Sequence, residues 1–289
     1  MSDPFLSLPG AVAAEGLGVP RHFGGPLVEQ RALESGDAIV SLGHRGVVVV
    51  SGVDRLSWLD SMTSQRLVGL VPGESTETLL LDPNGRIQHA LRVVDDGERC
   101  WLLVDEGEAP ALAEYLTRMR FALRVEVTEA SADYAAVAAF DGGAALPALR
   151  GLGRAVAEWR DGWGTVAPGG AQYAHRATDL PEITGSPDAP EHPAAGWSET
   201  QLVFAREDLP AVAELVRAGM LRAAGIDALD ALEVRAWRPG VHGEVDDRAL
   251  PHEFDWLRSA VHLTKGCSRG QETGAKVHTL GHPPRRLAM

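Results

Sequence analysis

Apolar and polar positions in the first half of the chain alternate between strand-like runs and helical stripes. A β-branched run at residues 47–50 predicts a buried strand. Asp54 follows this run and is a good N-cap, so a helix is expected to begin there. The buried face of that helix is predicted to consist of Leu56, Leu59 and Met62.

A β-hairpin and a second helix are predicted next. Residues 78–81 and 87–94 flank Asp82-Pro83-Asn84-Gly85, in which proline presets φ and Asn-Gly tolerates positive φ. Apolar residues between 112 and 119 recur at helical spacing and predict an amphipathic helix. Residues 121–127 alternate between apolar and polar side chains, which is typical of a half-buried strand.

The second half of the chain predicts another set of strands and helices. Strands are expected at residues 135–140 and 202–204, and the chain passes through residues 163–166 between them. Two helices are expected around residues 209–216 and 229–236. A stretch with several prolines at residues 177–196 is typical of a surface loop, and its acids and His192 are interpreted as solvated groups.

This order of elements predicts an α+β fold with two units. Residues 1–37 are rich in Gly and Pro and are expected to form an extended arm. A first α+β unit is expected at residues 38–130 and a second at residues 131–282, and the two units are allowed to interleave.

Composition and charge narrow the classes of partner. The formal net charge of −13 disfavours direct binding to nucleic acid, because a polyphosphate would be repelled. Two cysteines, Cys100 and Cys267, are too few for a disulfide framework and favour a reducing, cytoplasmic setting. The chain has no long uninterrupted apolar stretch, so neither a membrane anchor nor a membrane partner is expected. His252-Glu253 lacks the second histidine of a zinc-protease helix, and no resident metal site is predicted.

The segment around Cys267 carries the most distinctive chemistry. In an extended backbone Lys265, Cys267 and Arg269 project to one side, where two cations favour the thiolate. A helix beginning after Gly270 would lower the thiol pKa further. This pattern predicts a thiol suited to nucleophilic, redox or transient metal chemistry. The alternative, a buried and inert cysteine in a glycine turn, stays open at this point. Cys100 lies in an apolar run and is expected to be a structural strand residue.

The sequence of residues 265–272, Lys-Gly-Cys-x-x-Gly-Gln-Glu, resembles the signature of the YgfZ family. This family is related to GcvT, the aminomethyltransferase T-protein of glycine cleavage. The resemblance extends over roughly residues 38 to 287 and includes residues 46–56, the hairpin at 82–87 and residues 281–287.

The resemblance implies a tetrahydrofolate-binding fold of two ferredoxin-like α+β units, with the cysteine motif near the folate pocket. It implies a role in the assembly or repair of iron–sulfur enzymes as clients, including enzymes of tRNA modification. Matched positions then take family roles: Cys267 as reactive thiol, Lys265 as its cationic neighbour, Gly270 as the turn before a helix, and Gln271 and Glu272 as polar groups at the helix entry.

Several positions depart from the pattern of these relatives. Ala90 stands where the T-protein carries its catalytic aspartate, which argues against aminomethyl transfer. His89 beside it is a candidate base, with a structural role as the alternative. Ser268 replaces the usual aromatic residue after the cysteine. The family continues into a C-terminal β-barrel, whose start is expected at residues 283–289, so most of that barrel is expected to be absent.

Folate contacts are less defined by the sequence. Arg235 and Arg238, near the end of a predicted helix, are candidate partners for the glutamate tail, with solvated surface arginines as the alternative. Glu199 and Glu244 are candidates for reading the pterin by residue type alone. Two further functions remain open: a folate-dependent aminomethyl- or methyltransferase, and a non-catalytic scaffold of the same fold.

Overall fold

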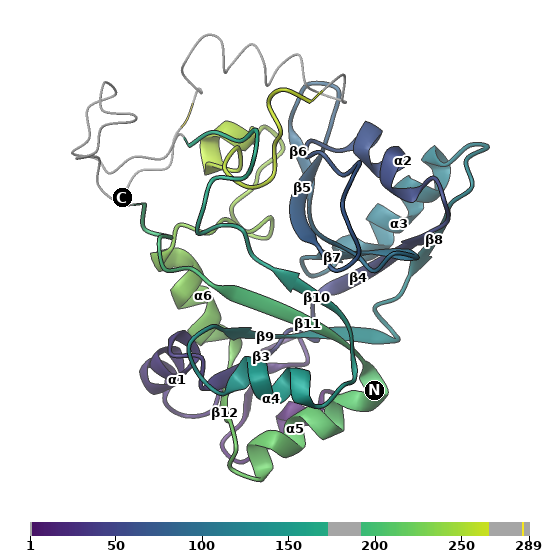
Figure 1. Cartoon of the computed structure of the whole chain (residues 1–289). Helices are drawn as coiled ribbons and strands as arrows, with labels where there is room; N and C mark the ends of the chain where they lie inside the picture. The colour runs from purple at the N-terminus through teal and green to yellow at the C-terminus, as the bar shows by residue number, and fades with distance from the viewer. Residues whose placement is uncertain (1, 173–191, 266–284, 286–289) are drawn as a thin grey trace.

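The computed structural model describes residues 2–172, 192–265 and 285, and its strands form two five-stranded sheets and one short ribbon (Figure 1). The first sheet has the order β5 (Ser75–Leu81), β6 (Ile87–Asp95), β7 (Arg99–Val104), β4 (Gly46–Ser51) and β8 (Glu126–Glu129), and all its pairs are antiparallel. The second has the order β10 (Ala155–Arg160), β11 (Glu199–Ala205), β9 (Tyr134–Phe140), β3 (Ala38–Ser41) and β12 (Arg222–Ala224), with only β3 and β12 parallel. The ribbon pairs β1 (Val12–Ala13) with β2 (Pro20–His22).

One face of the first sheet is covered by two helices, α2 (Arg55–Met62) and α3 (Glu108–Met119) (Figure 1). Alternate residues of the strands point into this layer, including Val48, Val50 and Leu102. From the helices, Leu59 and Leu112 pack against them with no exposed surface. This is the apolar face expected from the helical spacing of residues 112–119 and from the stripe that follows Asp54.

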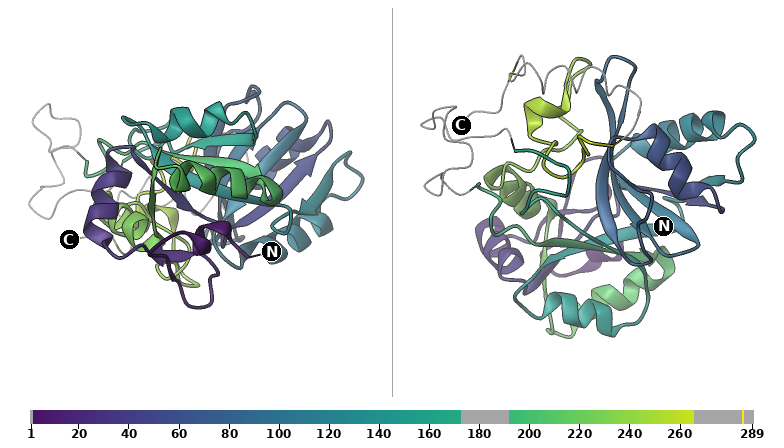
Figure 2. Two further views of the ribbon diagram at one scale, coloured as in Figure 1. Left: turned by 90° about the horizontal axis from the view of Figure 1, so that it is seen from below. Right: turned by 45° about the horizontal axis from the view of Figure 1, so that its top comes forward.

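The second sheet carries helices on both sides. Helices α4 (Ala145–Gly151) and α5 (Leu209–Arg217) pack on one side with Ile39, Val137 and Phe204. On the other side, α1 (Pro26–Glu34) and α6 (Ile226–Arg235) pack against Val40 and Ala138. Figure 2 shows these helices at one end of the molecule, away from α2 and α3.

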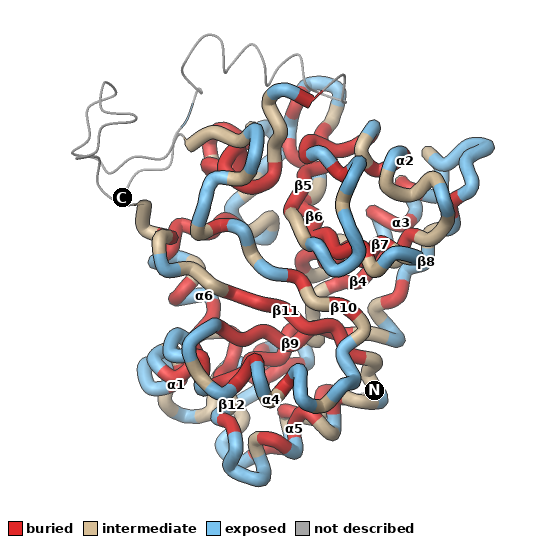
Figure 3. The backbone as a smooth tube through the Cα atoms, in the orientation of Figure 1, coloured by how far each residue is buried: buried red, intermediate tan, exposed pale blue. Residues whose placement is uncertain are grey.

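The face of the first sheet opposite α2 and α3 packs against β10 and β11 of the second sheet. Trp101 and Leu103 of the first sheet share an apolar cluster with Trp159 and Val203 of the second. The indole Nε1 of Trp159 donates a hydrogen bond to the carbonyl of Thr76 at 2.8 Å. At this junction β7 and β11 are buried along most of their length, whereas β10 is buried at Ala157 and Trp159 (Figure 3). One continuous interior therefore joins the two sheets.

The segment expected to be an extended arm is instead folded. Residues 4–34 contain a 3₁₀ turn (Pro4–Ser7), the β1–β2 ribbon and helix α1. Phe5 and Leu33 have no exposed surface, because they fill the cores on the two sides of the second sheet. Gly and Pro in this segment mark turns between short elements.

The strand expected at residues 121–127 is present only in its last part. Residues 120–124 form a turn with Phe121 at φ 46° and 80% exposed, and strand β8 begins only at Glu126. Trp163 follows β10 rather than belonging to a strand, and it is buried by packing beneath the end of α6. The carboxylate of Asp54 does not cap α2; it binds the backbone and side chain of Arg124.

The sheets do not divide at residue 130. Strand β3 belongs to the second sheet through β9 and β12, although it precedes the whole first sheet in sequence. Within the described ranges no sheet closes into a barrel. Of residues 283–289, expected as the start of a barrel, the structure describes Arg285 alone.

Candidate functional site

A cavity of about 390 Å³ lies where the second half of α6 meets the end of the first sheet. It falls within the roughly 300–1,000 Å³ range of small-molecule pockets. The walls come from the β3–β4 loop, strand β6, the end of β7, α6 and the segment after α6. The ionisable residues that line it are His44, Arg45, Arg92, Asp105, Glu106, Asp230, Glu233, Arg238, His242 and Glu244.

Several buried nitrogen atoms without a hydrogen-bond partner belong to residues that line this cavity. Among the described residues these include Nδ1 of His44, Nη1 of Arg45, Nε of Arg92 and Nη1 of Arg238. Other nitrogen atoms of these guanidinium groups form hydrogen bonds. Arg45 donates to Glu233 at 3.2 Å and Arg92 donates to Asp105 at 2.9 Å. Arg238 donates to Glu77 and Asp161. Unsatisfied buried donors are costly, so hydrogen-bond acceptors of a bound molecule would stabilise this arrangement.

Burial and the local charges fix the protonation states around the cavity. Burial raises the pKa of Asp105, but the nearby cations of Arg92 and Arg45 outweigh it and hold that pKa below the ordinary value. Burial and the cation of Arg45 lower the pKa of His44 to about 3, so its imidazole is neutral at neutral pH. Burial and the neighbouring carboxylate of Glu233 raise the pKa of Glu199 to about 7.

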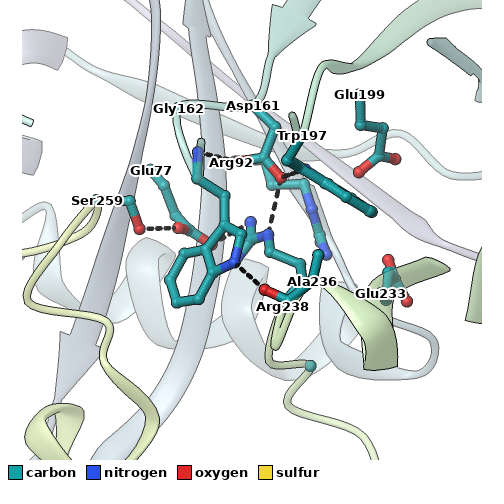
Figure 4. Close-up of polar contacts among 12 residues, drawn as sticks. Glu77, Arg92, Asp161, Gly162, Trp197, Glu199, Glu233, Ala236, Arg238 and Ser259 are labelled. Carbon is teal, nitrogen blue, oxygen red and sulfur yellow. Dashed lines mark hydrogen bonds and ion pairs between the residues drawn. The ribbon is translucent and has the colours of Figure 1, made fainter. Parts of the chain in front are cut away.

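Arg238 connects the cavity to a buried polar cluster behind it (Figure 4). Its Nη2 donates to Oε1 of Glu77 at 2.7 Å and its Nε donates to Oδ2 of Asp161 at 2.8 Å. The carboxylate of Glu77 also accepts from Trp256 Nε1 at 3.2 Å and from Ser259 Oγ at 2.6 Å. Each side chain of the triad Glu77, Arg238 and Asp161 is at most 3% exposed.

The position of Arg238 follows from the tight ending of α6. The helix stops at Arg235, and Trp237 adopts a left-handed conformation with φ 55°. Trp163 donates from its indole Nε1 to the carbonyl of Ala236 at 2.9 Å, which holds this turn. The Arg238 guanidinium then lies 5.2 Å from the Trp163 ring centroid, a cation–π distance.

The two arginines proposed as partners for a glutamate tail lie in different environments. Arg238 is buried between two carboxylates and lines the cavity. Arg235 is 56% exposed, forms an ion pair with Glu34 of α1 and does not line the cavity. The structure therefore brings only Arg238 to the cavity.

The side chain of Lys265 binds backbone carbonyls at the end of α2 and just after it. Its ammonium donates to the carbonyls of Thr63 at 2.8 Å and Gln65 at 2.7 Å, and also to the carbonyl of Asp60. The Asp60 carboxylate lies 3.5 Å away. These acceptors belong to the last turn of α2 and the residues that follow it, so the ammonium holds the Lys265 backbone against the first sheet.

The rest of the cysteine motif is not placed. Cys267, Gly270, Gln271 and Glu272 lie outside the described residues, and their roles stay predictions. Cys100, in β7, is fully buried, and burial raises the pKa of its thiol. The expectation that Cys100 is a structural strand residue is confirmed.

Ala90, which was compared with the T-protein's aspartate, and its neighbour His89 both lie in β6. Ala90 is 6% exposed and belongs to an apolar cluster with Trp163 and Trp256. His89 points to the other side of the strand, where Nδ1 lies 2.5 Å from Oε2 of Glu108. His89 does not line the cavity.

Sequence reasoning missed most of the residues that build the cavity. Glu244 does line it, and Glu199 lies behind Glu233, so both candidates chosen by type are close to it. The signal for Arg92 was present, since it is a charged residue within an apolar strand segment, whereas Glu77 lies between two threonines. A charge in such a position needs a buried partner, which the sequence did not identify.

The described residues contain neither a membrane-spanning helix nor a cluster of metal-ligating side chains. None of their helices has the length and apolar character needed to cross a membrane. Nor do they contain a group of three or more His, Cys, Asp or Glu side chains arranged to hold a metal ion.

Comparison with known sequences gives short matches at low identity, and no protein-family model matches the chain. An aminomethyltransferase of Bacillus velezensis is 32% identical over 86 residues, which covers 30% of this chain and 24% of that protein. The mitochondrial iron–sulfur cluster assembly factor IBA57 homolog of Mycosarcoma maydis is 28% identical over 122 residues, which covers 38% of this chain and 30% of that protein. Each match thus spans less than a third of the relative.

Comparison with solved structures extends over nearly the whole chain. The glycine cleavage system aminomethyltransferase T from Bartonella henselae superposes with a TM-score of 0.71 at 15% sequence identity, over 96% of this chain and 73% of that one. The chain therefore has the α+β fold of the GcvT aminomethyltransferase. Together with the aminomethyltransferase and IBA57 relatives, this fold confirms the resemblance to YgfZ- and GcvT-like proteins.

Proposed function

We propose that this protein is a tetrahydrofolate-binding accessory protein that supports the assembly or repair of iron–sulfur enzymes, including enzymes of tRNA modification, with Cys267 as a reactive thiol. The observation that carries the proposal is the cavity itself. Its side chains contribute buried donors without partners on Arg45, Arg92 and Arg238, in a space of small-molecule size. Such a set of donors is complementary to a ligand that is rich in acceptor atoms.

The residues of the cavity fit the pterin group of a reduced folate. A pterin presents ring nitrogen and carbonyl acceptors together with N–H donors on one flat ring. The free guanidinium N–H groups of Arg45, Arg92 and Arg238 match the acceptors. The carboxylate of Glu233 matches the donors, and the neutral imidazole of His44 suits either. When bound, tetrahydrofolate supplies N5 and N10 as carriers of one-carbon units.

The iron–sulfur role is supported by similarity to the IBA57 homolog, whose name assigns it to iron–sulfur cluster assembly. Ala90 adds to this support, because a methyl group buried in an apolar cluster can neither accept a proton nor stabilise a cation. Aminomethyl transfer would need another group in that place. His89, which pairs with Glu108 outside the cavity, does not provide one.

Folate binding is tested by titrating tetrahydrofolate into the protein and into Arg92→Leu, with binding followed by fluorescence or calorimetry. We expect saturable binding by the wild type and at least tenfold weaker binding by the variant, because one buried charge-assisted contact contributes on the order of 1.5–3 kcal/mol. Arg118→Leu is the control, because Arg118 is 66% exposed and pairs only with Glu114 on α3. Absence of saturable binding would favour the non-catalytic scaffold.

The thiol role is tested in cells that lack the endogenous factor and depend on it for an iron–sulfur enzyme. We expect Cys267→Ser to restore little of that enzyme's activity and Cys100→Ser to restore most of it, provided both variants accumulate equally. Full rescue by Cys267→Ser would remove the thiol from the mechanism.

A folate-dependent aminomethyl- or methyltransferase is the second candidate, favoured by the similarity to aminomethyltransferases and by the fold. It predicts turnover of an aminomethyl donor that depends on tetrahydrofolate. Detectable turnover by the wild type, lost in Arg92→Leu, would favour it over the accessory role.

A further inference from the structure

We propose that the cavity selects reduced folates with a short glutamate tail and discriminates against polyglutamylated forms. This inference rests on the proposed function, since it concerns the same cavity and specifies its ligand class. The observation behind it is the separation of charge between the floor of the cavity and its mouth.

The cavity carries an excess of negative charge. Five carboxylic acids line it against three arginines. His44 is neutral at neutral pH because its pKa is about 3. Arg238 is already balanced by Glu77 and Asp161, which lie behind the wall. The field that a ligand meets on entry is therefore that of the acids.

The arginines of the cavity lie deep and are paired with acids of similar depth, Arg92 with Asp105 and Arg45 with Glu233, whereas two further acids lie at the mouth. Arg92 and Arg238 are buried, with side chains at most 6% exposed, and Arg45 is 11% exposed. Asp230 and Glu244 are exposed lining residues at the mouth. A neutral ring with acceptor atoms gains the guanidinium donors on the floor, whereas a string of carboxylates would have to pass the two acids at the mouth.

Within the described part of the chain, no exposed residue that lines the cavity is an arginine or lysine, and Arg45 and Arg238 act on Asp230 and Glu244 only from deeper in the cavity. Arg235, the last residue of α6, forms an ion pair with Glu34 on α1 and does not line the cavity. The exposed lining residues are Asp230, Val234, His242, Gly243 and Glu244. Arginine and lysine form strong charge-assisted hydrogen bonds with carboxylates such as those of a polyglutamate tail, and none of these exposed lining residues is an arginine or a lysine.

Each additional γ-linked glutamate adds one negative charge to the folate tail. Like charges roughly 10 Å apart in water repel enough to change an equilibrium constant on the order of twofold at low ionic strength. The repulsion is screened at high salt, where the Debye length falls to about 3 Å. The proposal thus predicts both a direction and a salt dependence.

The first experiment compares three probes: a reduced pterin without a tail, tetrahydrofolate with one glutamate, and tetrahydrofolate with five glutamates. We expect the pentaglutamate to bind at least several-fold more weakly than the monoglutamate at low salt, with the difference shrinking toward none at 1 M salt. Equal or tighter binding of the pentaglutamate at low salt would overturn the inference. Failure of all three probes to bind would instead overturn the folate proposal.

The second experiment neutralises the mouth. In Asp230→Asn/Glu244→Gln we expect the ratio of monoglutamate to pentaglutamate affinity to fall toward one at low salt. The control is Glu98→Gln/Glu126→Gln, which changes the net charge equally at exposed positions that do not line the cavity. A ratio that responds equally in both double variants would assign the effect to net charge and refute a role for the mouth.

Discussion

Arg238 and Glu77 lie 161 positions apart, yet Nη2 of the arginine donates to Oε1 of the glutamate at 2.7 Å in the interior of the protein. Asp161 receives a second hydrogen bond from the same guanidinium at 2.8 Å. These contacts join β5, the end of β10 and the segment after α6. They also set the floor of the candidate folate cavity.

Replacing Arg238 by methionine is expected to lower the free energy of unfolding by about 3–5 kcal/mol, because two buried carboxylates lose their cation. Chemical denaturation measures the loss. Arg235→Met is the matched control on the same turn of chain, and its exposed ion pair with Glu34 is expected to contribute less than about 1 kcal/mol. Similar losses in both variants would contradict the assignment of Arg238 as the buried partner.

The carboxyl group of Glu199 gives a pH dependence of known sign. Burial and Glu233 raise its folded-state pKa to about 7 from an ordinary value of 4.5, so the folded protein binds more protons than the unfolded chain between these values. The contribution of Glu199 to stability is therefore present below pH 4.5 and lost as the pH rises through 7.

Glu199→Gln removes this titration while keeping an acceptor for the Gln201 amide. We expect the variant to gain about 1–3 kcal/mol relative to the wild type between pH 5 and pH 8, measured by urea unfolding at each pH. Glu158→Gln is expected to behave in the opposite sense, because hydrogen bonds from Arg150 lower the pKa of Glu158. An unchanged pH profile in Glu199→Gln would show that Glu199 is ionised in the folded protein throughout.

The two cysteines are expected to differ in reactivity. Cys100 is fully buried with a raised thiol pKa, so it should resist alkylation until the protein unfolds. Native protein is then expected to take up one equivalent of a thiol reagent, at Cys267, and Cys100→Ala to take up the same amount. Mass spectrometry after digestion identifies the site. Rapid modification of Cys100 would contradict the buried position of β7.

Lys265→Met tests both roles of that lysine. Loss of its hydrogen bonds to three backbone carbonyls is expected to lower the free energy of unfolding by about 2–4 kcal/mol. A role as cationic neighbour of Cys267 predicts in addition a higher thiol pKa, measured from the pH dependence of alkylation. Lys276→Met controls for loss of a lysine, since Lys276 is the other lysine of the chain. An unaltered thiol pKa in Lys265→Met would leave Lys265 only the structural role.

Features that depend on neighbours in sequence could be predicted from the sequence. The hairpin follows from local turn chemistry, and Asp82 Oδ1 indeed accepts from the backbone of Asn84 and Arg86. The helix at residues 112–119 follows from its apolar stripe. The strand expected at 121–127 begins only at Glu126, because Arg124 is bound by Asp54, which keeps residues 120–124 in a turn away from β4.

The candidate site was less predictable, because its contacts are long-range. Arg238 was selected for its place near a helix end, but burial by Trp163 and pairing with Glu77 depend on residues at least 75 positions away. The cavity residues His44, Arg45 and Asp105 belong to loops that have no motif. The cysteine motif, which the resemblance made prominent, continues beyond Lys265 outside the described residues.

The shared charge cluster behind the cavity has a consequence for how the molecule comes apart. Separation of the sheets would break the buried ion pairs of Arg238 with Glu77 and Asp161 and expose the apolar cluster that the sheets share, so partial opening loses much of the stabilisation that complete unfolding loses. Both halves of the chain are therefore expected to melt together in a single calorimetric transition, despite their distinct sheets. A guest molecule that engages Arg238 would raise that one melting temperature as a whole.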